Sequence, residues 1–201
     1  MNTEHTHAAA LKIARKMGIL RPRDLEACGI PRRYATLLYQ AGEIQRIGRG
    51  LYVTPENTVT ENHTLAFVGA RAPHAVICLL TALRFHELTT QQPTATWIAV
   101  SPKSRPPRLP EVALKVVRFS GKALSEGVQE HVLEGVRVRI TSPAKTVVDC
   151  FKYRNKIGRD VAVEALRDAM TQRKATLREL DRLARVCRVT TVIRPYLEFY
   201  L

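Results

Sequence analysis

Residues 31–54 read PRRYATLLYQAGEIQRIGRGLYVT, a helical apolar pattern followed by two short runs of β-prone residues. A helix is predicted over Pro31–Ala41, because proline suits the first turn of a helix and the glycine that follows suits its C-terminus. The runs Ile44–Ile47 and Leu51–Thr54 predict two strands, with a Gly-Arg-Gly turn between them. The stretch therefore predicts a basic helix followed by a basic β-hairpin.

The predicted helix has two distinct faces. Helical spacing gives it an inward apolar face of Tyr34, Leu37, Leu38 and Ala41. Its opposite face offers side chains that suit base edges in a DNA major groove, where arginine pairs with guanine and glutamine with adenine. These residues are Arg32, Arg33, Thr36 and Gln40. The alternative for the arginines is an ordinary solvated surface.

Two further helices are predicted upstream, over Ala8–Met17 and Arg21–Cys28. The order of helix, helix, basic helix and hairpin is typical of a winged helix-turn-helix, which we predict for residues 1–56. A small three-helix bundle with an incidental hairpin is the alternative. The predicted DNA-binding residues are Arg21 and Arg23 on phosphates, Arg32, Arg33, Thr36 and Gln40 in the major groove, and Arg46 and Arg49 on the hairpin.

The chain is strongly basic, with a formal charge of +14 and a pI near 10.2 over 201 residues. Such a balance favours polyanionic partners such as nucleic acid. Residues 1–54 hold nine basic and four acidic residues, a net of +5, but residues 101–154 reach +6. The positive charge is thus shared with the second part of the chain, which therefore also suits nucleic acid or an acidic partner.

Residues 57–201 predict a mixed α/β domain with a helical C-terminal part, which makes the whole chain α+β. The predicted helices are Thr60–Ala70, Val76–Leu88, Ser142–Tyr153, Arg159–Gln172 and Thr176–Val186, followed by a segment broken near Pro195. The predicted strands are Thr96–Val100, Val112–Phe119, and a hairpin of Val132–Leu133 and Val136–Ile140 that turns at Glu134-Gly135.

A second basic surface is predicted in this part of the chain. Four prolines exclude regular structure from Ser101–Pro110, and the cations of this loop suit phosphate contacts, although a plain surface connector explains it as well. The strand after Gly135 alternates apolar and basic residues, so that one face packs while the other presents arginines. The residues concerned are Lys103, Arg105, Arg108, Arg137 and Arg139.

The four cysteines and the apolar runs indicate in which cellular compartment the protein is expected. Cys28, Cys78, Cys150 and Cys187 are widely separated, which argues against a zinc site and favours core packing. No signal peptide and no apolar run long enough to cross a membrane is visible, so a cytoplasmic, reduced protein is expected. The histidines show no metal-ligand clustering, and neither a metal nor a cofactor is expected.

Motifs that would carry catalysis are weak in this sequence. Ser142-x-x-Lys145 has the serine–lysine spacing of penicillin-recognising acyl transferases, but their companion motifs are missing. A serine N-cap followed by a surface lysine explains this pair better. His86-Glu87 lacks the second histidine of a zinc-protease helix.

A nuclease or a nucleotidyltransferase is also poorly supported. No Asp or Glu is followed two residues later by lysine, the spacing common in metal-dependent nucleases. The late carboxylate pair Glu179 and Asp181 falls on a predicted helix, where residues i and i+2 diverge. We therefore expect no enzymatic activity, with a divergent nuclease as a minor alternative.

Short motifs along the chain resemble the AbiEi-type antitoxins and transcriptional regulators of bacterial abortive-infection (type IV toxin–antitoxin) systems. The motifs, spread over most of the chain, are Gly29-Ile30, Gln40-Ala41-Gly42-Glu43-Ile44, Ile47-Gly48-Arg49-Gly50-Leu51-Tyr52, Ala82-Leu83 with His86-Glu87-Leu88, and Thr141 to Cys150. The glycine-arginine-glycine turn with its following tyrosine is the most specific of them. Where the family usually has Glu-Arg or similar residues, this chain has Ala144-Lys145.

The resemblance implies an N-terminal winged-helix DNA-binding domain, a C-terminal antitoxin domain and a part in phage defence. It further implies a nucleotidyltransferase toxin that this protein counteracts, without requiring direct contact, and repression of a shared promoter through repeated operator sequences in double-stranded DNA. A rival function is an RNA-binding or toxin-neutralising module whose main surface is the basic second part of the chain.

Overall fold

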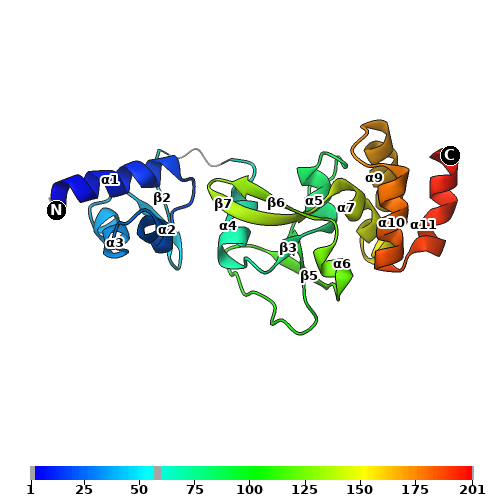
Figure 1. Ribbon diagram of the computed structural model, residues 1–201, viewed down its shortest axis with the longest axis horizontal. Helices are drawn as coiled ribbons and strands as arrows, with labels where there is room; N and C mark the ends of the chain where they lie inside the picture. The colour runs from blue at the N-terminus through cyan, green and yellow to red at the C-terminus, as the bar shows by residue number, and fades with distance from the viewer. Residues whose placement is uncertain (1–2, 57–59, 201) are drawn as a thin grey trace. The chain divides into compact units, whose positions relative to one another are not determined.

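The computed structural model describes residues 3–56 and 60–200, which form two compact units (Figure 1). Unit 1 is Met1–Ala70 with Val132–Arg137, and unit 2 is Arg71–His131 with Val138–Leu201. The predicted boundary between residues 56 and 57 adjoins residues 57–59, which lie outside the described ranges, so it stays a prediction. Helices combine with a two-stranded and a mixed five-stranded sheet, which confirms the α+β class.

Unit 1 begins with three helices around a small apolar core. Ala14, Leu25 and Leu38, one from each helix, lie in this core with exposures of 1% or less. The arrangement fits a helix-turn-helix. The elements are α1 (Thr3–Lys16), α2 (Pro22–Ala27), α3 (Arg33–Gln40), β1 (Gln45–Gly48), β2 (Leu51–Val53) and α4 (His63–Arg71).

The inward face of α3 differs from the predicted one. Tyr34, Ala35 and Leu38 are buried, whereas Leu37 is 39% exposed and Ala41 is also exposed. The predicted and the observed set of inward residues both follow helical spacing, so periodicity alone does not distinguish them. Packing against α1 and α2 selects the stripe that contains the small side chain of Ala35.

Strands β1 and β2 form an antiparallel hairpin with a register shift between Arg46 and Gly48. A third short segment joins them, because Leu20 and Tyr52 exchange two backbone hydrogen bonds of 2.8 and 2.9 Å. Gly50 has φ +69° in the turn, a left-handed conformation that glycine adopts without strain. The predicted hairpin is confirmed, and its base is tied to the segment between α1 and α2.

Unit 2 contains most of a five-stranded mixed sheet with the order β5-β4-β3-β7-β6. Strand β3 pairs antiparallel with β4 and parallel with β7, while β4 and β5 are parallel. The strands are β3 (Val76–Ile77), β4 (Thr96–Val100), β5 (Leu114–Arg118), β6 (Val128–Leu133) and β7 (Val136–Thr141). The strand prediction for Thr96–Val100 is confirmed.

The helix predicted over Val76–Leu88 is wrong at its start. Val76 and Ile77 form β3, and helix α5 begins only at Leu79 and ends at Phe85. Both β-branched residues pair with β4, and Ile77 also pairs with Ile140 of β7 on the other side. This pairing is non-local, so the apolar spacing of the segment could not reveal it.

The hairpin of β6 and β7 turns at Glu134 and Gly135, as predicted. Their φ angles of +48° and +75° match the two left-handed positions of a tight hairpin turn. On β7, Val136, Val138 and Ile140 are buried, Arg137 is exposed and Arg139 is half-buried. The predicted alternation is thus confirmed.

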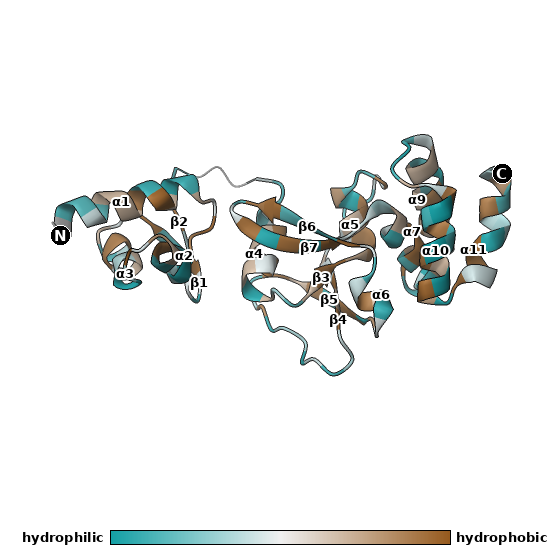
Figure 2. Cartoon of the chain, viewed as in Figure 1, coloured by the Kyte–Doolittle hydropathy of each residue, from teal (hydrophilic) through white to brown (hydrophobic). Residues whose placement is uncertain are grey.

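Helix α7 (Pro143–Lys152) is the centre of the unit 2 core. It packs against α5, α9 and α10, and every residue from Ala144 to Phe151 is buried. Figure 2 shows α10 with apolar and polar residues on one helix, typical of a helix that covers a core. The remaining elements are α6 (Lys122–Ser125), α8 (Arg154–Ile157), α9 (Arg159–Thr171), α10 (Leu177–Cys187), α11 (Thr190–Leu197) and the 3₁₀ helix η1 (Glu198–Tyr200).

The predicted break at Pro195 does not occur, because Pro195 lies inside α11. Two neighbours hold the helix to the core: Ile193 is fully buried, and the Tyr196 ring lies 5.0 Å from that of Phe151. Proline near the end of a short helix removes one backbone donor, and this packing offsets the loss.

Candidate nucleic-acid interface

The outward face of α3 presents three of the predicted groove-reading residues. Arg33, Thr36 and Gln40 are all exposed on this helix, while Tyr34 and Leu38 anchor its inner side. The Arg33 guanidinium lies 5.7 Å from the centre of the Tyr34 ring, a contact that orients the side chain. An arginine, a hydroxyl and an amide on one exposed helical face can meet base edges in a major groove.

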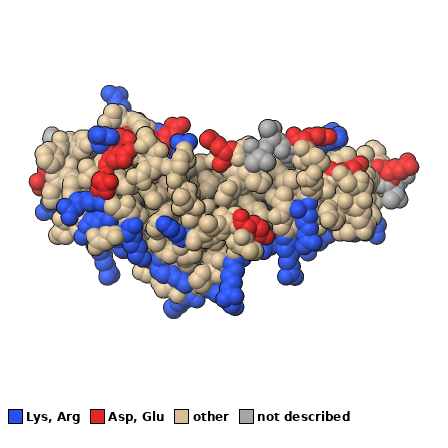
Figure 3. Space-filling view, turned by 180° about the vertical axis from the view of Figure 1, so that it is seen from behind, with Lys and Arg blue, Asp and Glu red and all other residues tan. Residues whose placement is uncertain are grey.

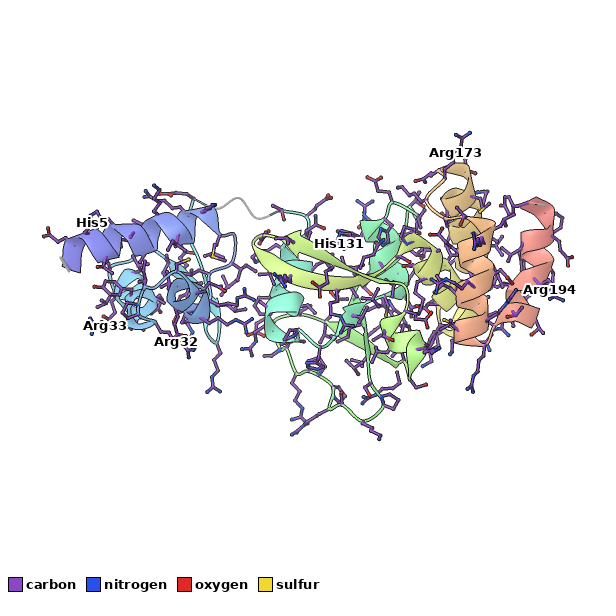
Figure 4. All side chains as sticks on the ribbon, in the orientation of Figure 1. His5, Arg32, Arg33, His131, Arg173 and Arg194 are labelled. Atoms are coloured by element: carbon purple, nitrogen blue, oxygen red, sulfur yellow. The ribbon has the colours of Figure 1, made fainter. Side chains whose placement is uncertain are left out.

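Arg32 precedes this helix and is held differently. Its Nε donates to a carboxylate oxygen of Glu26 at 2.8 Å, and both side chains are more than half exposed. Figure 4 shows Arg32 and Arg33 on the same side of unit 1. An exposed ion pair contributes little free energy, so a phosphate can displace Glu26 at small cost.

Arg21 differs from the other predicted DNA-binding residues, because its side chain is bound within the protein and is mostly buried. Its Nε and Nη2 each donate to the Asp24 carboxylate at 2.8 Å, and its backbone N–H donates at 2.9 Å. The Arg21 side chain is only 17% exposed. This bidentate contact stabilises the first turn of α2, so the role of Arg21 is structural. Arg23, which lies in α2, is exposed.

The hairpin carries the remaining two arginines of the predicted interface. Arg46 and Arg49 are both exposed, and the Arg46 Nε donates to the carbonyl oxygen of Gly48 at 3.2 Å. The rings of Tyr39 and Tyr52 lie 6.0 Å apart and connect α3 to β2. Sequence reasoning missed Tyr39, which lies outside the predicted apolar stripe, and it could have been found only as a partner of the hairpin tyrosine.

A second basic surface lies on the loop that joins β4 to β5 in unit 2. Lys103, Arg105 and Arg108 are all exposed there, in a loop without regular structure as predicted. Arg118 of β5 secures the loop, because its Nη1 donates to the carbonyl oxygens of Ser101 and Ser104 at 2.6 and 2.5 Å. In Figure 3, Lys and Arg gather along the lower side of this unit. Arg137 and Arg139 lie on β7 instead.

The serine–lysine pair is only partly as predicted. Ser142 is the N-cap of α7, and its Oγ accepts from the backbone N–H of Lys145 at 3.3 Å. The surface position predicted for Lys145 is wrong: its side chain is fully buried, and its Nζ lies 2.6 and 2.5 Å from the two carboxylate oxygens of Asp149. The lysine amine therefore faces a carboxylate and not the serine hydroxyl.

The surroundings of this pair do not activate a nucleophile. Burial raises the pKa of the Cys78 and Cys150 thiols well above their usual range, and it raises the pKa of Cys187 to about 11, with the Asp149 carboxylate adding to the shift. Such thiols stay protonated and unreactive at neutral pH. Cys28 departs from the predicted core packing, because it is exposed.

The described residues form neither a metal site nor a membrane-spanning helix. Across residues 3–56 and 60–200, no three His, Cys, Asp or Glu side chains come together in a way that could hold a metal ion. In the same part of the chain, no helix has the length and apolarity to cross a membrane.

Comparison with known proteins identifies a family for the N-terminal part of the chain. Residues 9–55 match the family described as transcriptional regulator, AbiEi antitoxin, which confirms the resemblance over that range. The match spans α2, α3 and the hairpin together with most of α1. No curated protein matches the chain.

A solved structure is similar over nearly the whole chain. The crystal structure of the RV2827C protein from Mycobacterium tuberculosis superposes with a TM-score of 0.59 at 16% identity, covering 90% of this chain and 70% of that one. At this identity the similarity concerns the fold alone.

Proposed function

We propose that this chain is a DNA-binding transcriptional regulator of the AbiEi type that also acts as an antitoxin. The exposed face of α3 with Arg33, Thr36 and Gln40 is the observation that carries the proposal. It lies within the residues that match the family of AbiEi antitoxin regulators, which supports both the regulatory and the antitoxin role. The protein would act in the cytoplasm, where its DNA lies.

The mode of binding we propose is that of a winged helix-turn-helix. Helix α3 enters the major groove, and Arg46 and Arg49 of the hairpin contact the neighbouring backbone or minor groove. Two observations support this: the hairpin follows α3 directly, and the Leu20–Tyr52 backbone bonds tie its base to the segment before α2. Arg23 and Arg32 then add phosphate contacts.

The target we propose is the promoter of the chain's own operon, with repeated operator sequences, and the counteracted toxin is a nucleotidyltransferase. This part rests on the resemblance of the sequence to the family. The protein itself acts as a binding protein and not as an enzyme, in keeping with the protonated thiols and with the Lys145 amine that faces Asp149.

Fluorescence anisotropy with duplex DNA from upstream of the gene tests the proposal, with a scrambled duplex of equal length beside it. At about 150 mM salt, a specific regulator prefers its operator by about a thousand-fold or more. Equal, weak and steeply salt-dependent binding to both duplexes would mean that the positive charge acts without sequence preference, and would contradict the proposal.

A second candidate function is RNA binding or toxin neutralisation through the β4–β5 loop. The hydrogen bonds from Arg118 to the carbonyl oxygens of Ser101 and Ser104 favour it, because they tie the loop with its three exposed cations to β5. Replacing Lys103, Arg105 and Arg108 by glutamine separates the functions. This candidate predicts that antitoxicity falls while operator binding persists, and unchanged antitoxicity would rule it out.

A further inference from the structure

A basic pocket lies in unit 2, away from the candidate DNA interface. It has a volume of about 340 Å³ and lies where α6, the end of α7 and the end of α10 meet. Three cations, one from each of these segments, line it: Lys122, Lys152 and Arg188. Ser120 adds a hydroxyl, and Ala123 and Val186 add apolar surface. The volume is near the lower end of the range for small-molecule sites.

Backbone groups hold the Lys152 ammonium and the main chain at residue 188. The Lys152 Nζ donates to the carbonyl oxygen of Cys187 at 3.1 Å, which directs this side chain toward the end of α10. Arg188 caps that helix with φ +58°, and its N–H and that of Val189 bond back to the last turn. The fold therefore fixes the Lys152 ammonium and the backbone of residue 188, and the Arg188 side chain is exposed beside them.

No acidic residue lines the pocket to neutralise these charges. Glu126, which follows α6, is already engaged by Arg182 at 2.8 Å. Within residues 3–56 and 60–200, Lys122, Lys152 and Arg188 take part in no ion pair with an N···O distance of 4.0 Å or less. The three cations are exposed, and none of them forms an ion pair with a carboxylate that the structure describes at the rim of the pocket.

Helix capping accounts for only part of this charge. The C-termini of α7 and α10 both end at the pocket, and each helix end carries roughly half a negative charge. Together they offset about one of the three cations, which leaves a surplus of about two positive charges. A phosphate group, with a charge of about −1.5 to −2 near neutral pH, matches that surplus.

We propose that this pocket binds a small molecule through a phosphate or diphosphate group. Arg188 offers the planar donor pair that suits phosphate oxygens, and Lys122 and Lys152 act as point charges beside it. The apolar side chains of Ala123 and Val186 contact the rest of the ligand. Such a site gives unit 2 a ligand of its own, independent of DNA binding by unit 1.

Isothermal titration of the full chain with sodium pyrophosphate tests the proposal, at constant ionic strength and with sodium sulfate as the reference anion. We expect saturable one-to-one binding that is at least tenfold tighter for pyrophosphate than for sulfate. Two variants, Arg188→Gly and Lys122→Ala, should each weaken it at least tenfold. Glycine accepts the left-handed φ of residue 188, so Arg188→Gly removes the charge without disturbing the turn, and its melting temperature should not fall.

The matched control is the double variant Arg159→Ala/Arg178→Ala, which removes two exposed cations of unit 2 outside the pocket. It should bind pyrophosphate as the unmodified chain does. Equal weakening in this control, or the absence of saturable binding in the unmodified chain, would overturn the proposal.

A competition experiment distinguishes a small ligand from the phosphates of nucleic acid. Pyrophosphate at saturation should leave the affinity for operator duplex unchanged, and Arg188→Gly should bind that duplex normally. Displacement of the duplex by pyrophosphate, together with weaker duplex binding by Arg188→Gly, would assign the pocket to nucleic acid and overturn the small-molecule proposal.

Discussion

Lys145 and Asp149 form a buried ion pair within helix α7, one turn apart, with side chains that are 0% and 1% exposed. The Lys145 Nζ also lies 4.4 Å from the centre of the Phe119 ring, and the Cys187 thiol lies 3.6 Å from an Asp149 oxygen. Burial raises the pKa of the Asp149 carboxyl, and the Lys145 ammonium opposes this shift. The pair is thus a structural unit at the centre of unit 2, and each charge depends on the other.

Removing one member of this pair should be costly. Asp149→Asn leaves the buried ammonium without a counter-charge, and we expect the free energy of unfolding to fall by about 3–5 kcal/mol in urea denaturation. The double variant Lys145→Met/Asp149→Leu removes both charges and should recover most of that loss. The exposed pair Asp181 and Arg185 has the same spacing, so Asp181→Asn is the control, with a change below about 0.5 kcal/mol. A double variant as unstable as Asp149→Asn would contradict this account.

Arg33 is expected to read a base. Arg33→Ala should weaken operator binding by about 1–3 kcal/mol and weaken binding to the scrambled duplex much less. Anisotropy titrations of both duplexes give the comparison. An equal loss on both sequences would make Arg33 a phosphate contact.

Arg49 at the hairpin turn is expected to contact the DNA backbone. Arg49→Ala should weaken binding to all sequences similarly and reduce the slope of log K against log salt by about 1, because one fewer counterion is released. Titrations at several salt concentrations measure this slope. An unchanged slope would remove the hairpin from the interface.

Arg21 and Arg23 lie two residues apart but should behave differently. Arg21→Ala breaks the bidentate contact with Asp24 and should lower the stability of unit 1 by about 1–2 kcal/mol. Arg23→Ala removes an exposed charge and should leave the thermal midpoint unchanged while weakening DNA binding. Thermal unfolding and anisotropy on both variants separate the roles, and equal thermal midpoints would refute the structural role of Arg21.

His86 should make unit 2 less stable in mild acid. Burial lowers the pKa of its imidazole, nearby His131 and Lys174 lower it further, and the hydrogen bond of Nε2 to the Thr141 carbonyl at 2.7 Å opposes them. The unfolded chain then binds a proton more readily than the folded one, so stability falls as pH drops below about 6.5 and is unaffected above it.

Urea denaturation at pH 7.5 and 5.5 checks the His86 effect. The unmodified chain should lose more stability between these pH values than His86→Gln, in which the titrating group is absent. Equal losses would show that other groups account for the acid sensitivity.

Several local features were predictable because short-range rules govern them. Ser142 caps α7 since its hydroxyl reaches a backbone N–H three residues on, and the Glu134-Gly135 turn follows from the left-handed conformations that a two-residue hairpin needs. The exposed face of α3 with Arg33 and Gln40 was predicted in the same way, from helical spacing. Each of these rules acts within a few residues of the chain.

Burial, in contrast, depends on which distant segments pack together. The sequence by itself determined that Ser142 begins a helix and that α3 has a basic face, because hydrogen bonding and helical periodicity are local. Only the tertiary structure decided that Lys145 lies in the core, where α5, α9 and α10 surround α7, and that Val76 and Ile77 form a strand between β4 and β7. A lysine on a helix and two β-branched residues have the same local pattern in either environment, and long-range packing selects between them.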